Sequence, residues 1–146
     1  MTHTMIFQVD TDATLDATHA ALTTADGVTA WWTDTATVPE TVGGHLELTF
    51  PGVPLPFDLI LDENGPGRVT WRAGGFPPPW QGTTCTWDLA DNPDADGTRL
   101  RFEHSGWEES NPAIGSVTFG WGQILGRLKH YLDTGTPDPF FINDAA

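Results

Sequence analysis

Apolar and polar residues alternate along several short stretches in the middle of the chain. The alternating stretches cover residues 46–50, 57–61, 85–89 and 100–104. A period of two is typical of strands that turn one face to a protein core and the other to water. The sequence Asn-Gly-Pro-Gly at 64–67 and the polar segment 91–97 are turn-like, so two β-hairpins are expected.

The segment 116–135 has a helical period instead. Its apolar residues, together with Ile114, fall within an arc about 100° wide, as expected for a helix that rests on a core. They are Ile114, Val117, Trp121, Ile124, Leu125, Leu128 and Leu132. Gly135, followed by Pro137 and Pro139, should end the helix. This is the only helical pattern long enough to cover several strands, so the sheet should lie against it.

The N-terminal part predicts a strand at 5–10, a small helix at 15–22 and a helical turn from Ala25 to Trp32. The chain of 146 residues fits one domain that spans 1–146. The expected fold class is α+β, with an antiparallel sheet, two short helices after the first strand and one long C-terminal helix.

Three glycines fall on one flank of the long helix, at Gly115, Gly122 and Gly126. Each glycine costs about 0.5–1 kcal/mol relative to alanine inside a helix. A structural or functional reason for glycine on this flank is therefore expected. Close approach of another backbone is the preferred explanation. A dimer contact and a nearby ligand remain open.

The chain is strongly acidic, with 6 Lys and Arg against 20 Asp and Glu and a formal net charge of −14. This charge disfavours nucleic acid and anionic membranes as partners. It fits general solubility or adaptation to salt better than one specific basic partner.

The first ten residues resemble no signal peptide, there is one cysteine, and no apolar run reaches the roughly 18 residues of a membrane span. We expect a cytoplasmic protein.

Several segments are similar, in order and spacing, to the Hsp90 ATPase activator homologue branch of the SRPBCC or START-like superfamily. They read LTTADGVTAWWT, VGGHLELTF, VTWRAGG, TTCTWDL, DGTRLRFEHSGW and GWGQILGRLKHYLDTG. The resemblance implies a helix-grip fold of the START-like or Bet v 1-like type. In this fold a curved antiparallel sheet wraps around the C-terminal helix and leaves a cavity between them. It does not imply a shared catalytic apparatus.

Bulky side chains on the inward faces are the candidate walls of that cavity, because such rings often leave concave apolar pockets. The expected ligand-binding residues are Phe50, Phe57, Trp71, Trp87, Phe102, His104, Trp121 and Leu125. The expected rim consists of Trp32, Trp80, Trp107 and Phe119. Plain core packing is the alternative for the rings, and contact with another protein is the alternative for the rim.

His104 shares the inward parity of Leu100 and Phe102. A neighbouring hydroxyl or backbone carbonyl should satisfy its imidazole, and the alternative is a polar anchor for a ligand. The other histidines have no metal-ligand spacing to His104 or to Cys85, which should be a small buried apolar residue. We expect no metal and no cofactor.

A calcium-loop pattern occurs at Asn92, Asp94, Asp96, Gly97 and Glu103. Such a loop needs a helix on each side, whereas strands are expected here. An extended chain would also carry Glu103 away from the aspartates, at about 3.3 Å per residue. A hairpin loop is the preferred interpretation.

The expected function is non-catalytic binding of a small, mainly hydrophobic ligand by a monomer or homodimer. The sequence has no serine elbow, no phosphate-binding glycine loop and no matched cysteine and histidine. The alternatives are a cyclase-like or hydrolase-like enzyme that uses the same pocket, and an interaction module that binds a chaperone or another protein through its surface.

Overall fold

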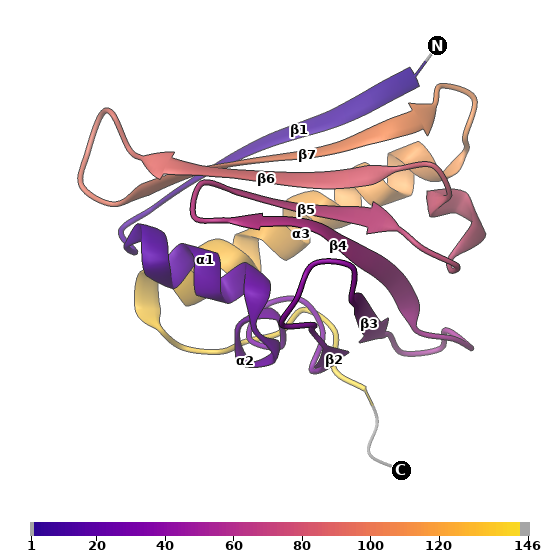
Figure 1. Ribbon diagram of the computed structural model, residues 1–146, viewed down its shortest axis with the longest axis horizontal. Helices are drawn as coiled ribbons and strands as arrows, with labels where there is room; N and C mark the ends of the chain where they lie inside the picture. Colours follow the sequence, from indigo (N-terminus) through magenta and orange to yellow (C-terminus); the bar gives the residue numbers. More distant parts are fainter. Residues whose placement is uncertain (1, 144–146) are drawn as a thin grey trace.

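The computed structural model describes residues 2–143 and contains one seven-stranded antiparallel sheet (Figure 1). The strand order is β1-β7-β6-β5-β4-β3-β2. The strands are β1 (Thr2–Thr11), β2 (Thr35–Thr37), β3 (His45–Thr49), β4 (Phe57–Gly65), β5 (Arg68–Ala73), β6 (Thr84–Asp91) and β7 (Thr98–Glu108). The helices are α1 (Leu15–Thr23), α2 (Ala25–Val28) and α3 (Ala113–Thr134), with a single 3₁₀ turn, η1 (Pro78–Trp80).

The helix-grip architecture is confirmed. The long helix α3 crosses the strands on one face of the sheet (Figure 1). Helix α1 packs against β6 and against α3, so the early helices lie on the same face. Outward residues of the strands, such as Arg72 and Arg101, are exposed on the opposite face, which agrees with the alternation of apolar and polar residues.

Both predicted hairpins are present. Strands β4 and β5 are joined at residues 65–68, and the segment 92–97 joins β6 to β7. The inward residues of the second hairpin, such as Trp87 and Phe102, are fully buried. Strand β2 was not predicted, because its three residues are too few to display a period.

Helix α3 begins three residues before the predicted segment 116–135. It ends at Thr134, directly before Gly135, as predicted. Gly135 adopts the left-handed conformation, with φ +75°, and its N–H donates to the carbonyl of Tyr131. The centre of the predicted stripe is buried, at Trp121, Ile124, Leu125 and Leu128.

The core between α3 and the sheet consists largely of indole rings. Trp32 packs on Trp121 with ring centroids 5.0 Å apart and stacks on Trp71 at 6.0 Å. Trp87 stacks on Phe102 at 4.0 Å, and Phe102 contacts Trp121 at 4.5 Å. These rings, together with the other buried indoles between α3 and the sheet, form what we call the indole layer.

The expectation that a backbone lies close to the glycine flank of α3 is wrong. Gly115, Gly122 and Gly126 are exposed. A β-carbon at any of them would meet no heavy atom of residues 2–143 within 4 Å, other than the adjoining turns of the helix. Gly122 and Gly126 border an open groove between α3 and strand β1. This flank therefore faces the groove and water rather than another backbone.

Gly126→Ala should therefore stabilise the protein by about 0.5–1 kcal/mol, because alanine has the higher helix propensity and nothing crowds its methyl group. Thermal unfolding would measure the change. Gly97→Ala is a contrasting control, since Gly97 has φ +101° and its β-carbon would collide with the carbonyl oxygen of Thr11. A fall in stability for Gly126→Ala would contradict the open flank.

Candidate functional site

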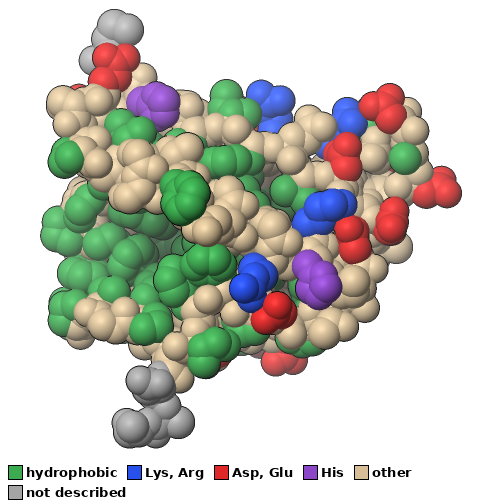
Figure 2. All heavy atoms as spheres, turned by 180° about the vertical axis from the view of Figure 1, so that it is seen from behind, with side chains coloured by type: hydrophobic (Ala, Val, Ile, Leu, Met, Phe, Trp, Pro, Cys, Tyr) green, Lys and Arg blue, Asp and Glu red, His purple; other side chains and the backbone are tan. Residues whose placement is uncertain are grey.

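An open pocket lies between the N-terminal half of α3 and the loops that follow α2 and β3. Its volume is about 230 Å³. We call it the aromatic pocket, and its lining residues are Trp32, Phe50, Pro51, Val53, Phe57, Trp80, Val117, Gly120, Trp121, Ile124 and Phe141. Figure 2 shows the molecule from behind. Apolar side chains gather around a hollow at the left of this view, and most of the visible charged side chains lie at the right.

Helix α3 supplies one wall. Val117, Gly120, Trp121 and Ile124 lie on one face of the helix, because residues three, four and seven positions apart are neighbours on its surface. Gly120 leaves room at the centre of this wall, since a β-carbon there would have no neighbour among residues 2–143 within 4 Å beyond the local helix backbone.

Rings from the loops and from β4 make the opposite wall. Phe57 meets Phe50 edge-on at 4.6 Å between centroids and meets Trp80 at 5.2 Å. Phe141 meets Phe50 edge-on at 5.0 Å. Edge-to-face pairs are a favoured aromatic geometry, so these rings support one another around the hollow.

A chain of buried hydrogen bonds fixes two of the walls. The indole N–H of Trp121 donates to Nδ1 of His104 at 3.0 Å. On the other side of the ring, Nε2 of His104 lies 2.9 Å from the hydroxyl of Thr83. That hydroxyl donates to the carbonyl of Trp80 at 2.6 Å. We call this set the indole–imidazole chain.

The chain determines the protonation state of His104. An indole nitrogen can only donate, so Nδ1 must be the bare, accepting nitrogen, and Nε2 carries the proton that is given to Thr83. Burial lowers the pKa of His104 from 6.5 to about 3, because the charged form loses its hydration. The imidazole is therefore neutral, and it accepts a hydrogen bond at Nδ1 and donates one from Nε2. Its role here is to position Trp121 and Trp80.

No general acid or base lines the aromatic pocket. Every lining residue within 2–143 is apolar or glycine, and none carries a titratable side chain. Cys85 is buried in the core, where loss of hydration raises the pKa of its thiol. The arrangement can bind and orient an apolar molecule, but these walls offer it no proton transfer or nucleophile.

The structure brings five of the predicted residues to the aromatic pocket. Phe50, Phe57 and Trp121 were expected as walls, and Trp32 and Trp80 were expected at the rim. The other six lining residues were missed as site residues, although Val117 and Ile124 were expected on the core-facing stripe of the helix; they are Pro51, Val53, Val117, Gly120, Ile124 and Phe141. Nothing in the sequence pattern could have placed Phe141, because it follows the end of the helix and belongs to no periodic element.

The other predicted residues lie elsewhere. Trp71, Trp87, Phe102 and His104 are buried behind the pocket walls, and they line none of the hollow. Leu125 borders the groove beside β1, Trp107 is fully buried, and Phe119 is 70% exposed on α3. These residues do not line the pocket because the indole layer fills the centre of the core. The aromatic pocket therefore lies toward one end of α3.

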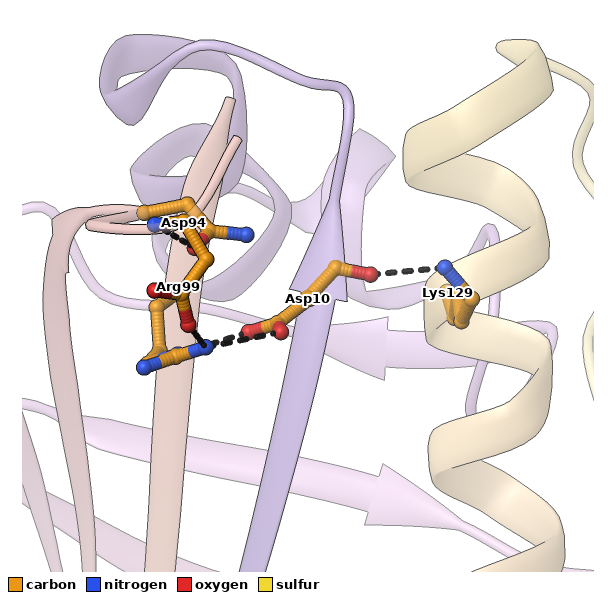
Figure 3. Close-up of polar contacts among 5 residues, drawn as sticks. Asp10, Asp94, Arg99 and Lys129 are labelled. Carbon is orange, nitrogen blue, oxygen red and sulfur yellow. Dashed lines mark hydrogen bonds and ion pairs between the residues drawn. The ribbon is translucent and has the colours of Figure 1, made fainter. Parts of the chain in front are cut away.

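The segment with the calcium-loop pattern is a hairpin loop, as preferred from the sequence. The carboxylate of Asp94 is paired with Arg99 at 3.1 Å, and Arg99 also binds Asp10 at 3.0 Å (Figure 3). Lys129 of α3 donates to the backbone carbonyl of Asp10 at 2.6 Å. Glu103 lies on β7 opposite Thr86. In residues 2–143, no group of three or more His, Cys, Asp or Glu side chains is placed to hold a metal ion.

Within the same range, no helix combines the length and the apolar character that crossing a bilayer requires.

The neutral state of His104 has a consequence for pH dependence. The unfolded chain takes up a proton at this residue below pH 6.5, whereas the folded protein does so only near pH 3. The stability contributed by neutral His104 is therefore complete above pH 6.5. It should fall by about 1.4 kcal/mol per pH unit as the pH drops from 6.5 toward 4.

Urea unfolding at several pH values would measure this slope, with His104→Gln as the control that removes the titration. Nitrogen chemical shifts of the imidazole should also show the Nε2-protonated tautomer at pH 7. Equal slopes for the two proteins between pH 6.5 and 4.5 would contradict the buried neutral imidazole.

Comparison with known proteins supports the fold described above. The family model described as "Activator of Hsp90 ATPase homolog 1-like protein" matches residues 12–133. None of the curated proteins matches the sequence.

Three solved structures share the fold. The solution structure of the Aha1 dimer from Colwellia psychrerythraea is 27% identical, with a TM-score of 0.80 over 91% of this chain and 98% of that one. DynU16, a putative protein in the dynemicin biosynthetic locus, is 26% identical, with a TM-score of 0.76 over 92% of this chain and 48% of that one. Protein MLL2253 from Mesorhizobium loti is 21% identical, with a TM-score of 0.74 over 89% of this chain and 96% of that one, and it shows the fold alone. With the family model spanning most of its length, the chain belongs to the family of Activator of Hsp90 ATPase homolog 1-like proteins.

Proposed function

We propose that the protein binds a small, mainly apolar molecule in the aromatic pocket and does not transform it. The observation that carries the proposal is an open hollow of about 230 Å³ whose lining side chains are all apolar. Small-molecule sites are typically concave and lined by hydrophobic and aromatic side chains.

The size and lining of the pocket restrict the ligand. A cavity of about 150 Å³ lined by apolar side chains can bind benzene, so this pocket suits a molecule of one or two rings. Burial of its apolar surface would contribute about 25 cal/mol per Å². An anionic ligand is disfavoured, because no basic side chain lines the pocket and the net charge of −14 repels anions.

The relatives support a small-molecule role without defining it. DynU16 comes from a biosynthetic locus, which is in keeping with a protein that handles a small organic compound. We also propose a cytoplasmic location, because the one cysteine of the chain is free and buried.

Gly120→Leu should block the aromatic pocket, because the new side chain would extend from the centre of the α3 wall into the hollow. We expect the affinity for naphthalene, followed by tryptophan fluorescence, to fall more than about tenfold, since the bound ring and the leucine would occupy the same space. Gly115→Leu is a matched control on the same helix, at an exposed glycine that lines no part of the pocket.

Both substitutions replace a helical glycine, so both should keep or raise thermal stability. Equal naphthalene binding by the two variants and the native protein would refute the pocket as the binding site. Absence of binding by the native protein to naphthalene and to other neutral ring compounds would refute the proposed function.

A second candidate function is a contact with a chaperone or with a second copy of the chain. It is favoured by the family match, by the dimeric state of the Colwellia relative and by the exposed ring of Phe119 on α3.

If Phe119 lies in a homodimer interface, light scattering should give twice the mass of the chain, and Phe119→Ser should lower the mass to that of a monomer. Leu55→Ser, at another exposed apolar residue, is the control and should leave the dimer intact. A monomeric native protein would remove the homodimer from consideration.

A further inference from the structure

One wall of the aromatic pocket comes from a segment that follows the last helix. Residues 136–143, which we call the C-terminal strap, run back from the end of α3 across the segment 30–34. The backbone hydrogen bonds that join them are Asp138 N–H to Ala30 O (2.8 Å), Phe140 N–H to Trp31 O (3.1 Å), Phe141 N–H to Trp32 O (2.9 Å) and Asp34 N–H to Phe141 O (3.0 Å).

The beginning of the strap is held by α3. Arg127 forms an ion pair with the carboxylate of Asp138 at 3.0 Å and donates to the backbone carbonyl of the same residue at 3.1 Å. Its guanidinium also lies 5.6 Å from the ring centre of Phe140. These contacts fix the direction in which the strap leaves the helix.

The far end of the strap is held by Asn143. Its side-chain amide donates to the carboxylate of Asp34 at 2.7 Å, to the hydroxyl of Thr33 at 3.1 Å and to the carbonyl of Thr49 at 3.0 Å. Its backbone N–H also donates to Asp34 at 3.1 Å. The strap is therefore tied at both ends, and Phe141 lies between the ties.

Phe141 is the residue of the strap that reaches the aromatic pocket. Its ring lines the hollow and meets Phe50 edge-on at 5.0 Å. Its backbone N–H is bonded to Trp32, another lining residue. The match to the family model ends at residue 133, so Phe141 lies outside the matched residues.

We infer that the C-terminal strap is a specificity element of the aromatic pocket, in which Phe141 limits the length of the ligand. The inference rests on the proposed function, since it assigns the determinant of ligand size in the same pocket. A shorter side chain at 141 would open the hollow toward the strap, whereas a larger one would shorten it.

The test uses two neutral probes, naphthalene and the longer N-phenyl-1-naphthylamine, and compares the ratio of their dissociation constants. Phe141→Ala should shift the ratio by roughly three- to tenfold toward the longer probe, as expected for loss of one aromatic contact. Phe141→Trp should shift it in the opposite direction. Ile142→Ala is the control, because Ile142 is 60% exposed on the same strap and lines no part of the pocket.

A structural readout accompanies the binding data. Hydrogen exchange at the amides of Phe140 and Phe141 should slow when naphthalene binds to the native protein, because the ligand would pack on the strap. Circular dichroism would show whether each variant keeps its fold, and Phe141→Trp retains an aromatic ring if Phe141→Ala does not fold.

The outcomes separate the two proposals. Native binding with an unchanged ratio in Phe141→Ala and Phe141→Trp would overturn the role of the strap and leave the proposed function standing. Binding of the probes by Phe141→Ala but not by the native protein would overturn the proposed function, and the role of the strap as a specificity element with it. Absence of binding in all variants would overturn the proposed function, and the role of the strap with it.

Discussion

The indole–imidazole chain is the constraint on which the geometry of the pocket depends. His104 is buried, and its two nitrogens bind groups on opposite sides of the core, the indole of Trp121 on α3 and the hydroxyl of Thr83 beside η1. A buried polar group left without a partner costs about 1–3 kcal/mol, so the members of this chain are locked to one another. The helix and the turn that carries Trp80 are thereby held at a fixed separation, and the pocket lies between them.

The indole layer explains why the hollow is where it is. The rings of Trp71 and Trp87 are larger than the aliphatic side chains that usually fill such a core, and they occupy its centre completely. The space that remains lies at one end of α3, and a groove runs along its glycine flank. Within residues 2–143, the indole nitrogens of Trp87 and Trp107 have no hydrogen-bond partner.

Local patterns in the sequence predict the sheet, the hairpins and α3 well, because each depends on a period or on a turn residue that is visible over a few positions. They predict the inward direction of His104 for the same reason. They could not predict which inward rings would border empty space, since parity places Trp71 and Phe50 on the same side without giving the thickness of the layer. They also could not place Phe141, whose position depends on backbone hydrogen bonds to residues more than a hundred positions away.

The pairing of β1 with β7 joins distant parts of the chain, from Thr2 opposite Glu108 to Thr11 opposite Thr98. Closing a connection of this length is entropically expensive, so sheets built on such pairings form slowly. During synthesis, the first strand has no partner until residues 98–108 have left the ribosome. Until then, Met5 and Val9, which are buried in the folded protein, lack the strand that covers them. During this interval the nascent chain is most open to aggregation or to capture by a chaperone.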